Sequence, residues 1–338
     1  MTAIADWTEF AACAVVIGYA GARLTRLADA IAEKTGLSGS WIGLLLLAAA
    51  TSLPELATGI SAVAVAAAPN MAIGNVLGST IFNLALLVLV DFLHQPESIY
   101  TRASHGHILS AAFGVVLLGI IGASLLLERD QVLPAIAHVG ATAPLLIAVY
   151  LVAMRNVYDF ERRQPRDAES ALPQRYKSLG LRAALLQFAL FALIVAVMGT
   201  WLPVVAVRIA ESMDWSRSFV GTLFVTVVTA LPETVVTVSA LRLGALDMAI
   251  ANLLGSNLFN IVVVLSIDDL LHVQGPILAA VSPVHAVTAF SAAMMSGAVI
   301  IGLVYRPGRP WQRAPGVVSL ALLTVYLINV YVLYVRGE

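Results

Sequence analysis

The chain has 338 residues, of which 60% are hydrophobic and 12% are charged, and its formal net charge is −1. Soluble globular proteins carry about 25% charged residues, so the composition excludes an ordinary soluble domain and indicates a membrane-embedded protein. The single cysteine excludes a disulfide framework within the chain and a metal site built from several cysteines.

Ten apolar segments follow one another along the chain, each close to the roughly 20 residues that a membrane-spanning helix needs. Asp6 and Glu9 lie where a cleavable signal would be positively charged, so we expect residues 10–27 to be retained as a spanning helix. The sequence thus predicts an all-α polytopic membrane protein with spans near 8–28, 38–66, 70–93, 105–127, 132–154, 180–209, 217–241, 246–271, 282–305 and 314–335.

The longest polar connection, residues 155–179, divides the ten helices into five and five. Cytoplasmic loops are enriched in lysine and arginine, and 15 of the 19 basic residues fall on the side of this connection. We therefore expect a multi-pass protein of the cell (inner) membrane with both termini outside. Its parts would be a first five-helix repeat at 1–154, a cytoplasmic linker at 155–179 and a second five-helix repeat at 180–338.

The two halves resemble each other in sequence. When Gly43 is aligned with Gly221, identical residues recur through segments 43–83 and 221–260, and the match extends to Asp91 and Asp268. Repeats that are offset by five helices cross the membrane in opposite directions, and inverted repeats with interrupted helices are typical of secondary transporters. Asp91 and Asp268 lie near helix ends, and we expect them to be structural.

The second and seventh spans each carry a proline followed by a glutamate, in TSLPE (51–55) and TALPE (229–233). Proline interrupts a helix and frees a carbonyl, which at membrane depth needs a cation, water or a neighbouring helix. Oxygen ligands with two carboxylates suit a hard cation such as Ca2+. Glu55 and Glu233 are therefore candidate cation ligands. The alternative is that the prolines only kink the helices and that the glutamates are protonated or hydrogen-bonded.

A second polar element recurs as GNVLGSTIFN (74–83) and ANLLGSNLFN (251–260). Its polar residues are spaced four apart and so share one helix face. Ordinary helix packing by small and amide residues accounts for Asn75 and Asn252. The residues that we expect to line the site or the ion pathway are Ser79, Asn83, Ser256 and Asn260.

These paired motifs resemble the two alpha-repeats of the cation/calcium exchanger superfamily, in particular bacterial and archaeal sodium/calcium exchangers. The resemblance implies that Glu55 and Glu233 bind Ca2+ together with the carbonyls of Thr51 and Thr229. It implies a core of helices 2, 3, 7 and 8, beside which helices 1 and 6 slide as a pair. It also implies flanking sodium sites and equatorial positions formed by Ser52, Ser79, Ser256, the carbonyls of Ala48 and Thr226, Asn83 and Asn260.

The chain departs from the family pattern at two positions. Ala230 stands where the second half usually has a serine, and Asn260 stands where prokaryotic members often carry aspartate. The expected function is an antiporter that exchanges Ca2+ for Na+, and the alternative is exchange of Ca2+ or another divalent cation for protons at the same glutamates. A cation channel would need a continuous polar pathway, whereas the polar residues cluster in two midplane elements.

An enzyme is not expected, because no histidine lies at mid-membrane to act as a base. The expected partners are inorganic cations and bilayer lipid, with no nucleic acid and no cofactor beyond the transported ions. The sequence does not predict an oligomeric state.

Overall fold

The computed structural model describes residues 3–94, 97–127, 134–163, 176, 178–213, 225–307 and 316–336. Helices dominate these ranges. The first half contains α1 (Ala3–Thr35), α2 (Gly39–Ile42), η1 (Gly43–Leu47), α3 (Ala48–Thr51), α4 (Leu53–Ala64), α5 (Pro69–Leu93), α6 (Ile99–Arg102), α7 (Gly106–Leu127), β1 (Ala135–Ile136), β2 (Val139–Gly140) and α8 (Thr142–Arg163). The second half contains α9 (Leu181–Ser212), α11 (Val225–Thr229), α12 (Leu231–Arg242), α13 (Leu246–Phe259), η5 (Asn260–Val264), α14 (Leu265–Leu271), η6 (Ile277–Ala279), α15 (Val284–Tyr305) and α16 (Val317–Arg336).

Nine helical segments in the described ranges are long and apolar enough to cross a membrane, and each overlaps a predicted span. The remaining prediction, residues 217–241, falls partly outside the described residues. From residue 225 onward it forms the two helices α11 and α12. The sequence therefore located the spans from their length and apolar composition alone.

The fifth predicted span, residues 132–154, is wrong in its boundaries. The antiparallel pair β1–β2 occupies residues 135–140, and α8 begins at Thr142 and continues to Arg163. An apolar window does not distinguish a short hairpin of alanine, isoleucine and valine from the first turn of a helix. At the other end, Arg162 and Arg163 lie in the last turn of α8, where positive charge is favourable. Residues 155–163, predicted as the start of the linker, are therefore helical.

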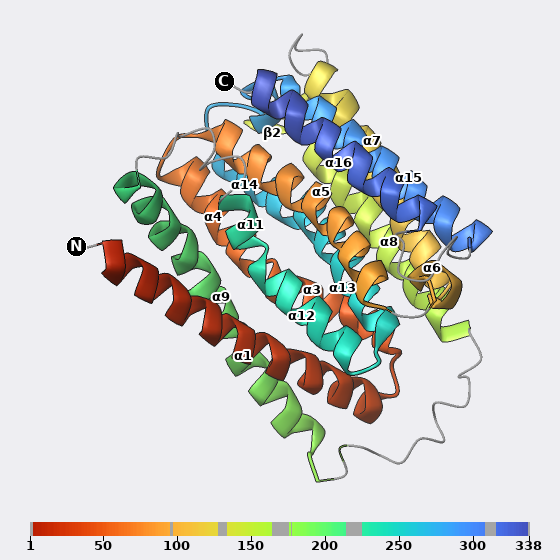
Figure 1. Ribbon diagram of the computed structural model, residues 1–338. Coiled ribbons are helices and arrows are strands. Elements are labelled where there is room, and N and C mark those ends of the chain that lie inside the picture. The colour runs from red at the N-terminus through yellow and green to blue at the C-terminus, as the bar shows by residue number, and fades with distance from the viewer. Residues whose placement is uncertain are drawn as a thin grey trace.

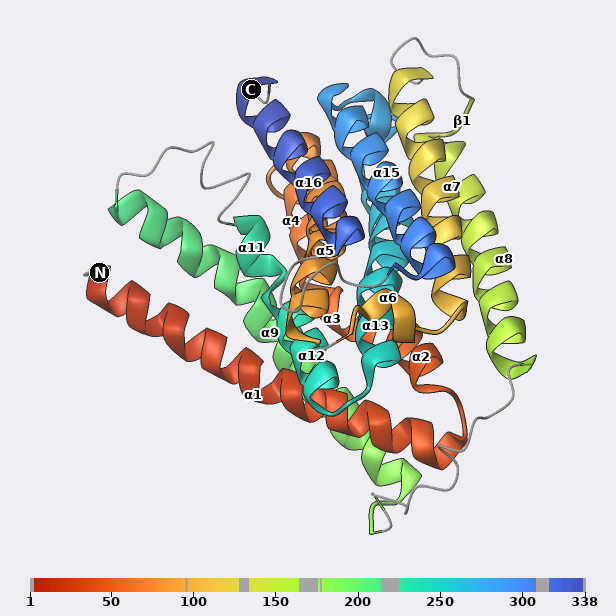
Figure 2. The same cartoon turned by 45° about the vertical axis from the view of Figure 1, so that its right-hand side comes forward.

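Helices α1 and α9 form a layer of their own beside the other helices (Figures 1 and 2). Where α1 begins, charged and polar side chains join the two helices. Arg208 Nε lies 3.1 Å from Asp6 Oδ1, and the Arg208 guanidinium also pairs with Glu9. Trp201 Nε1 donates to Glu9 Oε1 at 2.6 Å. These contacts tie together two helices that are distant in the sequence.

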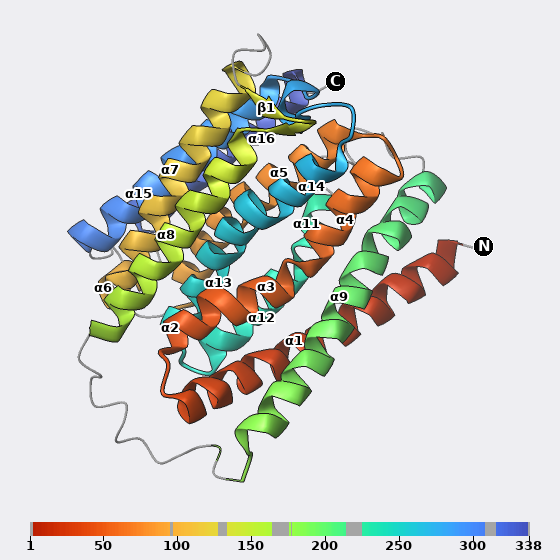
Figure 3. The same cartoon turned by 180° about the vertical axis from the view of Figure 1, so that it is seen from behind.

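The central element of the remaining layers is α13, which lies between α3 and α7 in the view from behind (Figure 3). Every residue of α13 except Asp247 and Phe259 is buried, including the polar residues Asn252, Ser256 and Asn257. Burial on all sides is expected of a helix in the middle of a bundle. This packing holds the second polar element of the sequence, residues 251–260, away from lipid.

Both termini lie on one side of the molecule. In Figure 1 the beginning of α1 and the end of α16 are at the upper left, whereas the end of α8 and the beginning of α9 are at the lower right. We refer to these two sides as the terminus face and the linker face. An even number of crossings between the two termini follows from this arrangement.

The register between the two repeats changes after Asn260. Asn260–Val264 form the π-helical turn η5, in which Leu265 N donates to Asn260 O, five residues back. Such a turn accommodates one extra residue within a helix. Asp91 Oδ1 accepts from the backbone N–H eight residues later, at Ile99, and Asp269 Oδ1 accepts from Ile277, also eight residues later, at 3.0 and 2.7 Å respectively. The structural counterpart of Asp91 is therefore Asp269, and the expected pairing with Asp268 is wrong.

Replacing Asp91 by asparagine is expected to lower the free energy of unfolding by about 2–4 kcal/mol. The buried carboxylate accepts hydrogen bonds from Ser98 Oγ (2.9 Å), Ile99 N and Ser319 Oγ (2.7 Å), and an amide offers one acceptor oxygen in place of two. Thermal unfolding in detergent measures the effect, with the exposed Glu97→Gln as the control. An unchanged midpoint for Asp91→Asn would contradict the structural role.

Candidate functional site

The first-repeat motif breaks its helix at Ser52. This residue has φ −87° and ψ 1°, and it separates α3 from α4. Pro54 lies in the first turn of α4, where a missing N–H is tolerated. Because Pro54 has no N–H, the carbonyl of Ala50 loses its helical partner. The break therefore places Glu55 in the first turn of a new helix at mid-span.

The second-repeat motif repeats this geometry at Ala230, which has φ −81° and ψ 7° and separates α11 from α12. Pro232 and Glu233 follow in the first turn of α12. The predicted interruption of the second and seventh spans is therefore confirmed at both positions. Thr51 and Thr229 are the last residues of the preceding half-helices, and both are fully buried.

The two glutamates are completely buried, and none of their four carboxylate oxygens accepts a hydrogen bond of normal geometry from the described residues. Glu233 lies within electrostatic range of Glu55, and Thr51 and Ser52 are also its neighbours. A buried carboxylate without a donor costs several kcal/mol unless a cation or a proton neutralises it. The structure thus brings together two acidic side chains with oxygens available for a ligand.

Three hydrogen bonds join polar side chains of the two repeat motifs. Thr51 Oγ1 and Ser256 Oγ are 3.2 Å apart, and Asn260 Nδ2 donates to Ser79 Oγ at 3.1 Å. Asn83 Nδ2 donates to Asn257 Oδ1, also at 3.1 Å. Each bond joins a residue of one half to a residue of the other, so the two motifs form one structural unit.

Asn83 and Asn260 donate these bonds through their side-chain nitrogens, so their side-chain oxygens remain available as acceptors. The side-chain oxygens of Asn83, Asn260 and Ser52 are buried and have no partner in the described part of the chain. Carboxylate, amide and hydroxyl oxygens of this kind are the ligands that Ca2+ accepts, and it takes six to eight of them. The donor set therefore fits a hard cation.

Two other predicted site residues, Ala48 and Thr226, and the departure from the family pattern at Ala230 differ in what they can offer. The carbonyl of Ala48 already accepts from Ser52 N at 3.0 Å and from Thr51 Oγ1 at 3.3 Å. Thr226 lies in α11, but its side chain is outside the described part of the structure. Ala230 is fully buried and brings no hydroxyl to the second break.

Asn75 was expected to serve packing only, yet its Nδ2 donates to the backbone carbonyl of Glu55 at 3.2 Å. This bond fixes the first turn of α4 against α5. The repeat-related Asn252 instead donates to Thr237 Oγ1 at 3.2 Å. The four-residue spacing in the sequence places Asn75 on the same face of α5 as Ser79 and Asn83, but it does not indicate which atom accepts the hydrogen bond of Asn75.

Gly199 of α9 is a contact residue that the motifs do not reveal. A Cβ at this position would lie 2.5 Å from Pro54 Cγ and 3.5 Å from Pro232 Cγ. Helix α9 therefore crosses both helix breaks at one point, and only glycine allows the approach. In the sequence, the feature that could have indicated this close approach is a glycine in the middle of an apolar span.

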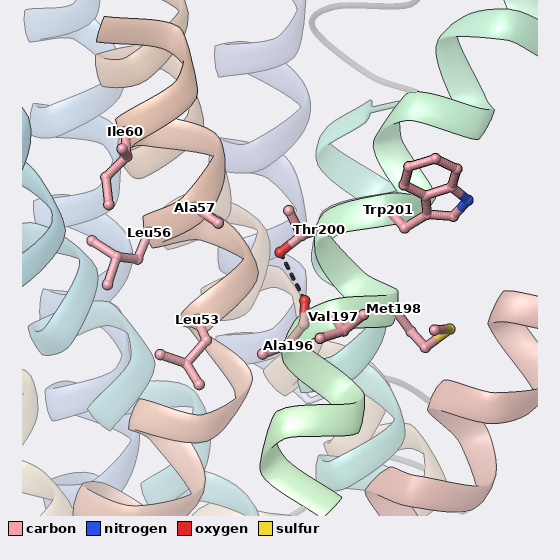
Figure 4. Close-up of a pocket in the computed structure, with 9 residues that line it drawn as sticks. All are labelled: Leu53, Leu56, Ala57, Ile60, Ala196, Val197, Met198, Thr200 and Trp201. Carbon is pink, nitrogen blue, oxygen red and sulfur yellow. Dashed lines mark hydrogen bonds between the residues drawn. The ribbon is translucent and has the colours of Figure 1, made fainter. Parts of the chain in front are cut away.

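A groove of about 640 Å3 opens between α4 and α9, and the side chains that line it are shown in Figure 4. Its walls are Leu53, Leu56, Ala57 and Ile60 on one side and Ala196, Val197, Met198, Thr200 and Trp201 on the other. Thr200 Oγ1 is bonded to Ala196 O at 2.7 Å, so the groove offers little to a cation. The chemistry lies in the buried cluster instead.

Comparisons with known proteins agree with this picture. Sodium/calcium exchanger MaX1 of Methanosarcina acetivorans is 27% identical over 332 residues, which cover 90% of this chain and 92% of that protein. Inner membrane protein YrbG of Escherichia coli is 25% identical over 259 residues, covering 76% and 77% of the two chains. A solved structure of the sodium-calcium exchanger NCX_Mj superposes with a TM-score of 0.72 at 18% identity and covers 98% of this chain and 99% of that chain. The likeness confirms the all-α fold of inverted repeats.

The match to a protein family covers most of the chain. Residues 7–158 and 183–335 match the family described as sodium/calcium exchanger protein. The two matched segments contain both interrupted helices, both glutamates and both asparagine-rich elements. The chain is a multi-pass membrane antiporter and belongs to the sodium/calcium exchanger protein family.

Proposed function

We propose that the chain is a secondary antiporter that exchanges Ca2+ for Na+ by alternating access at a site built around Glu55 and Glu233. The observation that carries this proposal is the burial of two carboxylates from inverted repeats, whose oxygens accept no hydrogen bond of normal geometry from the described residues. Facing carboxylates repel strongly at low dielectric, so an empty, ionised site is costly. One Ca2+ or a set of Na+ ions neutralises the pair.

The ligand oxygens for Ca2+ would be the carboxylates of Glu55 and Glu233 and the carbonyls of Thr51 and Thr229. Both carboxylates begin a half-helix whose N-terminus also faces the break, and both threonines end the preceding half-helix. Oxygens for Na+ would come from the surrounding positions Ser52, Ser79, Ser256, Asn83, Asn260 and the carbonyls of Ala48 and Thr226. The unpartnered oxygens of Ser52, Asn83 and Asn260 support this assignment.

Exchange is obligatory if only an occupied site passes through the occluded state. The Ca2+ load and the Na+ load cannot bind together, because their summed charge would exceed that of two carboxylates. The α1–α9 layer would slide past the core to expose the site on alternate faces. The contact of Gly199 with Pro54 and Pro232 supports this role, since α9 touches both breaks.

The terminus face is outside and the linker face is cytoplasmic in the proposed orientation. The basic residues support it: Arg162 and Arg163 end α8 on the linker face, and Arg182 lies in the first turn of α9 there. Arg208, near the terminus face, is paired with Asp6 and Glu9. Positive charge therefore accumulates on the proposed cytoplasmic side.

Reconstituted vesicles test the proposal. An outward Na+ gradient is expected to drive uptake of radioactive Ca2+, with no uptake when Na+ is replaced by choline. Uptake that follows a pH gradient and ignores Na+ would contradict sodium coupling. Ca2+ flux that needs no counter-ion on the other side would contradict an antiporter altogether.

The second candidate function is exchange of Ca2+ for protons at the same two glutamates. Ala230 favours it, because the second break lacks the hydroxyl that the first break has in Ser52, and one sodium ligand is therefore absent. In this case protonation of Glu55 and Glu233 would replace the sodium load. The vesicle assay separates the two candidates, because only one of the two gradients drives uptake.

Ser52→Ala is expected to raise the Na+ concentration for half-maximal exchange roughly five-fold, since one hydroxyl ligand is worth about 1 kcal/mol. The half-saturating Ca2+ concentration should change less, because the carboxylates dominate Ca2+ binding. Thr324→Ala is the matched control, since it removes a hydroxyl from α16 that is bonded only within its own helix, to Leu320 O. An equal change in both ion dependences would contradict a sodium-specific role for Ser52.

A further inference from the structure

We propose that Asp268 is a further cation-binding residue, which lies between the two-glutamate site and the terminus face and receives the transported cation on its way to or from Glu55. This inference rests on the proposed function. It concerns a carboxylate whose expected role, from the sequence, was structural.

The burial of Asp268 is the first observation. Its side chain is completely buried, and neither carboxylate oxygen has a hydrogen-bond partner among the described residues. The adjacent Asp269 is satisfied, because it accepts from Gly140 N at 2.9 Å and Ile277 N at 2.7 Å. Two neighbouring carboxylates thus have opposite surroundings, and only Asp269 has the contacts of a structural residue.

The position of Asp268 is the second observation. A Cβ on Gly59 would lie 2.6 Å from both Asp268 oxygens, so the carboxylate rests directly on the backbone of α4. Gly59 is four residues after Glu55 and shares its face of α4, about 6 Å further along the helix axis. Figures 1 and 3 both show α14 beside α4. Glu55 and Asp268 therefore follow one another along the α4–α14 interface, toward the terminus face.

The register shift is the third observation. Since Asp91 corresponds to Asp269, the residue of the first repeat that corresponds to Asp268 is Val90, which is buried and apolar. The turn η5 begins at Asn260 and brings Asp268 into this position, and π-turns occur frequently at functional sites. The first repeat has no such acidic residue, so the proposed site exists on one side of the membrane only.

This asymmetry gives a test in which the two faces of the membrane are compared. In vesicles of known orientation, Asp268→Asn is expected to raise the half-saturating Ca2+ concentration on the terminus face by at least about five-fold. The half-saturating concentration on the linker face and the maximal rate should stay close to wild type. Asp268→Glu keeps the carboxylate and should restore part of the lost affinity.

Gly59→Ala provides an independent variant, because it leaves Asp268 charged but displaces it from α4. It should produce the same one-sided defect, and it carries the test if Asp268→Asn does not fold. Asp269→Asn is the matched control. It should lower the unfolding temperature, because two backbone donors lose a carboxylate, and should leave both half-saturating concentrations unchanged.

The proposal is overturned if Asp268→Asn, or Gly59→Ala in its place, matches wild type on both faces. It is also overturned if the two faces change equally, since that is the result of a general structural defect. A failure of the proposed function is distinguishable, because wild-type vesicles would then show no gradient-driven Ca2+ exchange at all.

Discussion

Glu55→Gln is expected to abolish Ca2+ exchange while the helices stay in place. Glutamine has nearly the same size as glutamate, but it removes one of the two charges that offset a divalent cation. Loss of a charged ligand in a buried site costs about 3 kcal/mol or more, so the initial rate of Ca2+ uptake should fall at least about 100-fold. Tracer uptake in vesicles at fixed Ca2+ measures this directly.

Glu233→Gln should have the same effect, because the two residues occupy equivalent positions in the two breaks. The exposed Glu97→Gln is a control for loss of a carboxylate elsewhere and should transport normally. Uptake above about a tenth of the wild-type rate in either buried variant would show that its carboxylate is not a required ligand.

Thermal unfolding of both buried variants should also respond to Ca2+ differently from that of wild type. Without Ca2+ they should be as stable as wild type or more so, because the repulsion between two buried carboxylates is removed. Saturating Ca2+ stabilises a binding protein by about 2.7 kcal/mol at 100 times Kd, and the variants should lack this gain. Protection by Ca2+ that persists in both variants would place the cation elsewhere.

Gly255→Ala is expected to disrupt both the packing and the transport. A Cβ at Gly255 would overlap Leu44 O and lie 2.8 Å from Ala48 Cβ, so α13 would have to move away from η1 and α3. Ser256, the next residue, would then lose its contact with Thr51 Oγ1. Overpacking of this kind costs about 1–3 kcal/mol. Unfolding in detergent and tracer uptake should both show the loss.

Gly297→Ala in α15 is the matched control, since a Cβ there meets no atom within 4 Å in the structure. Alanine is the better helix former by about 1 kcal/mol, so this variant should be as stable as wild type or slightly more stable. If Gly255→Ala behaved like Gly297→Ala, the close approach of α13 to η1 would not matter for the site.

The sequence predicted the fold well because the physical signals were strong. Spanning length, apolar composition and the repeated Pro-Glu pairs identify the helices and the two breaks, and the structure has the breaks at Ser52 and Ala230. The hairpin at 135–140 was missed because its residues are as apolar as those of the helix that follows. The shift after Asn260 was missed because a π-turn has no signature in the composition.

The sequence predicts which residues belong to the candidate site, but it does not predict which atoms they contact. Spacing places Asn75 and Asn83 on one face of α5, but it does not determine that Asn75 bonds to Glu55 O or that Asn83 bonds to Asn257. The environment of Asp268 depends on how α14 packs against Gly59, which involves residues more than 200 positions apart in the sequence. Such contacts follow from tertiary packing and not from a local pattern.

Calorimetric titration of the purified protein with Ca2+ tests most directly the central claim that the two glutamates form one cation site. Wild type should show a saturable binding event, and both Glu55→Gln and Glu233→Gln should lose it, because each removes half of the same charge pair. If either single variant bound Ca2+ with wild-type affinity, the two carboxylates would not form one site and the account would be contradicted.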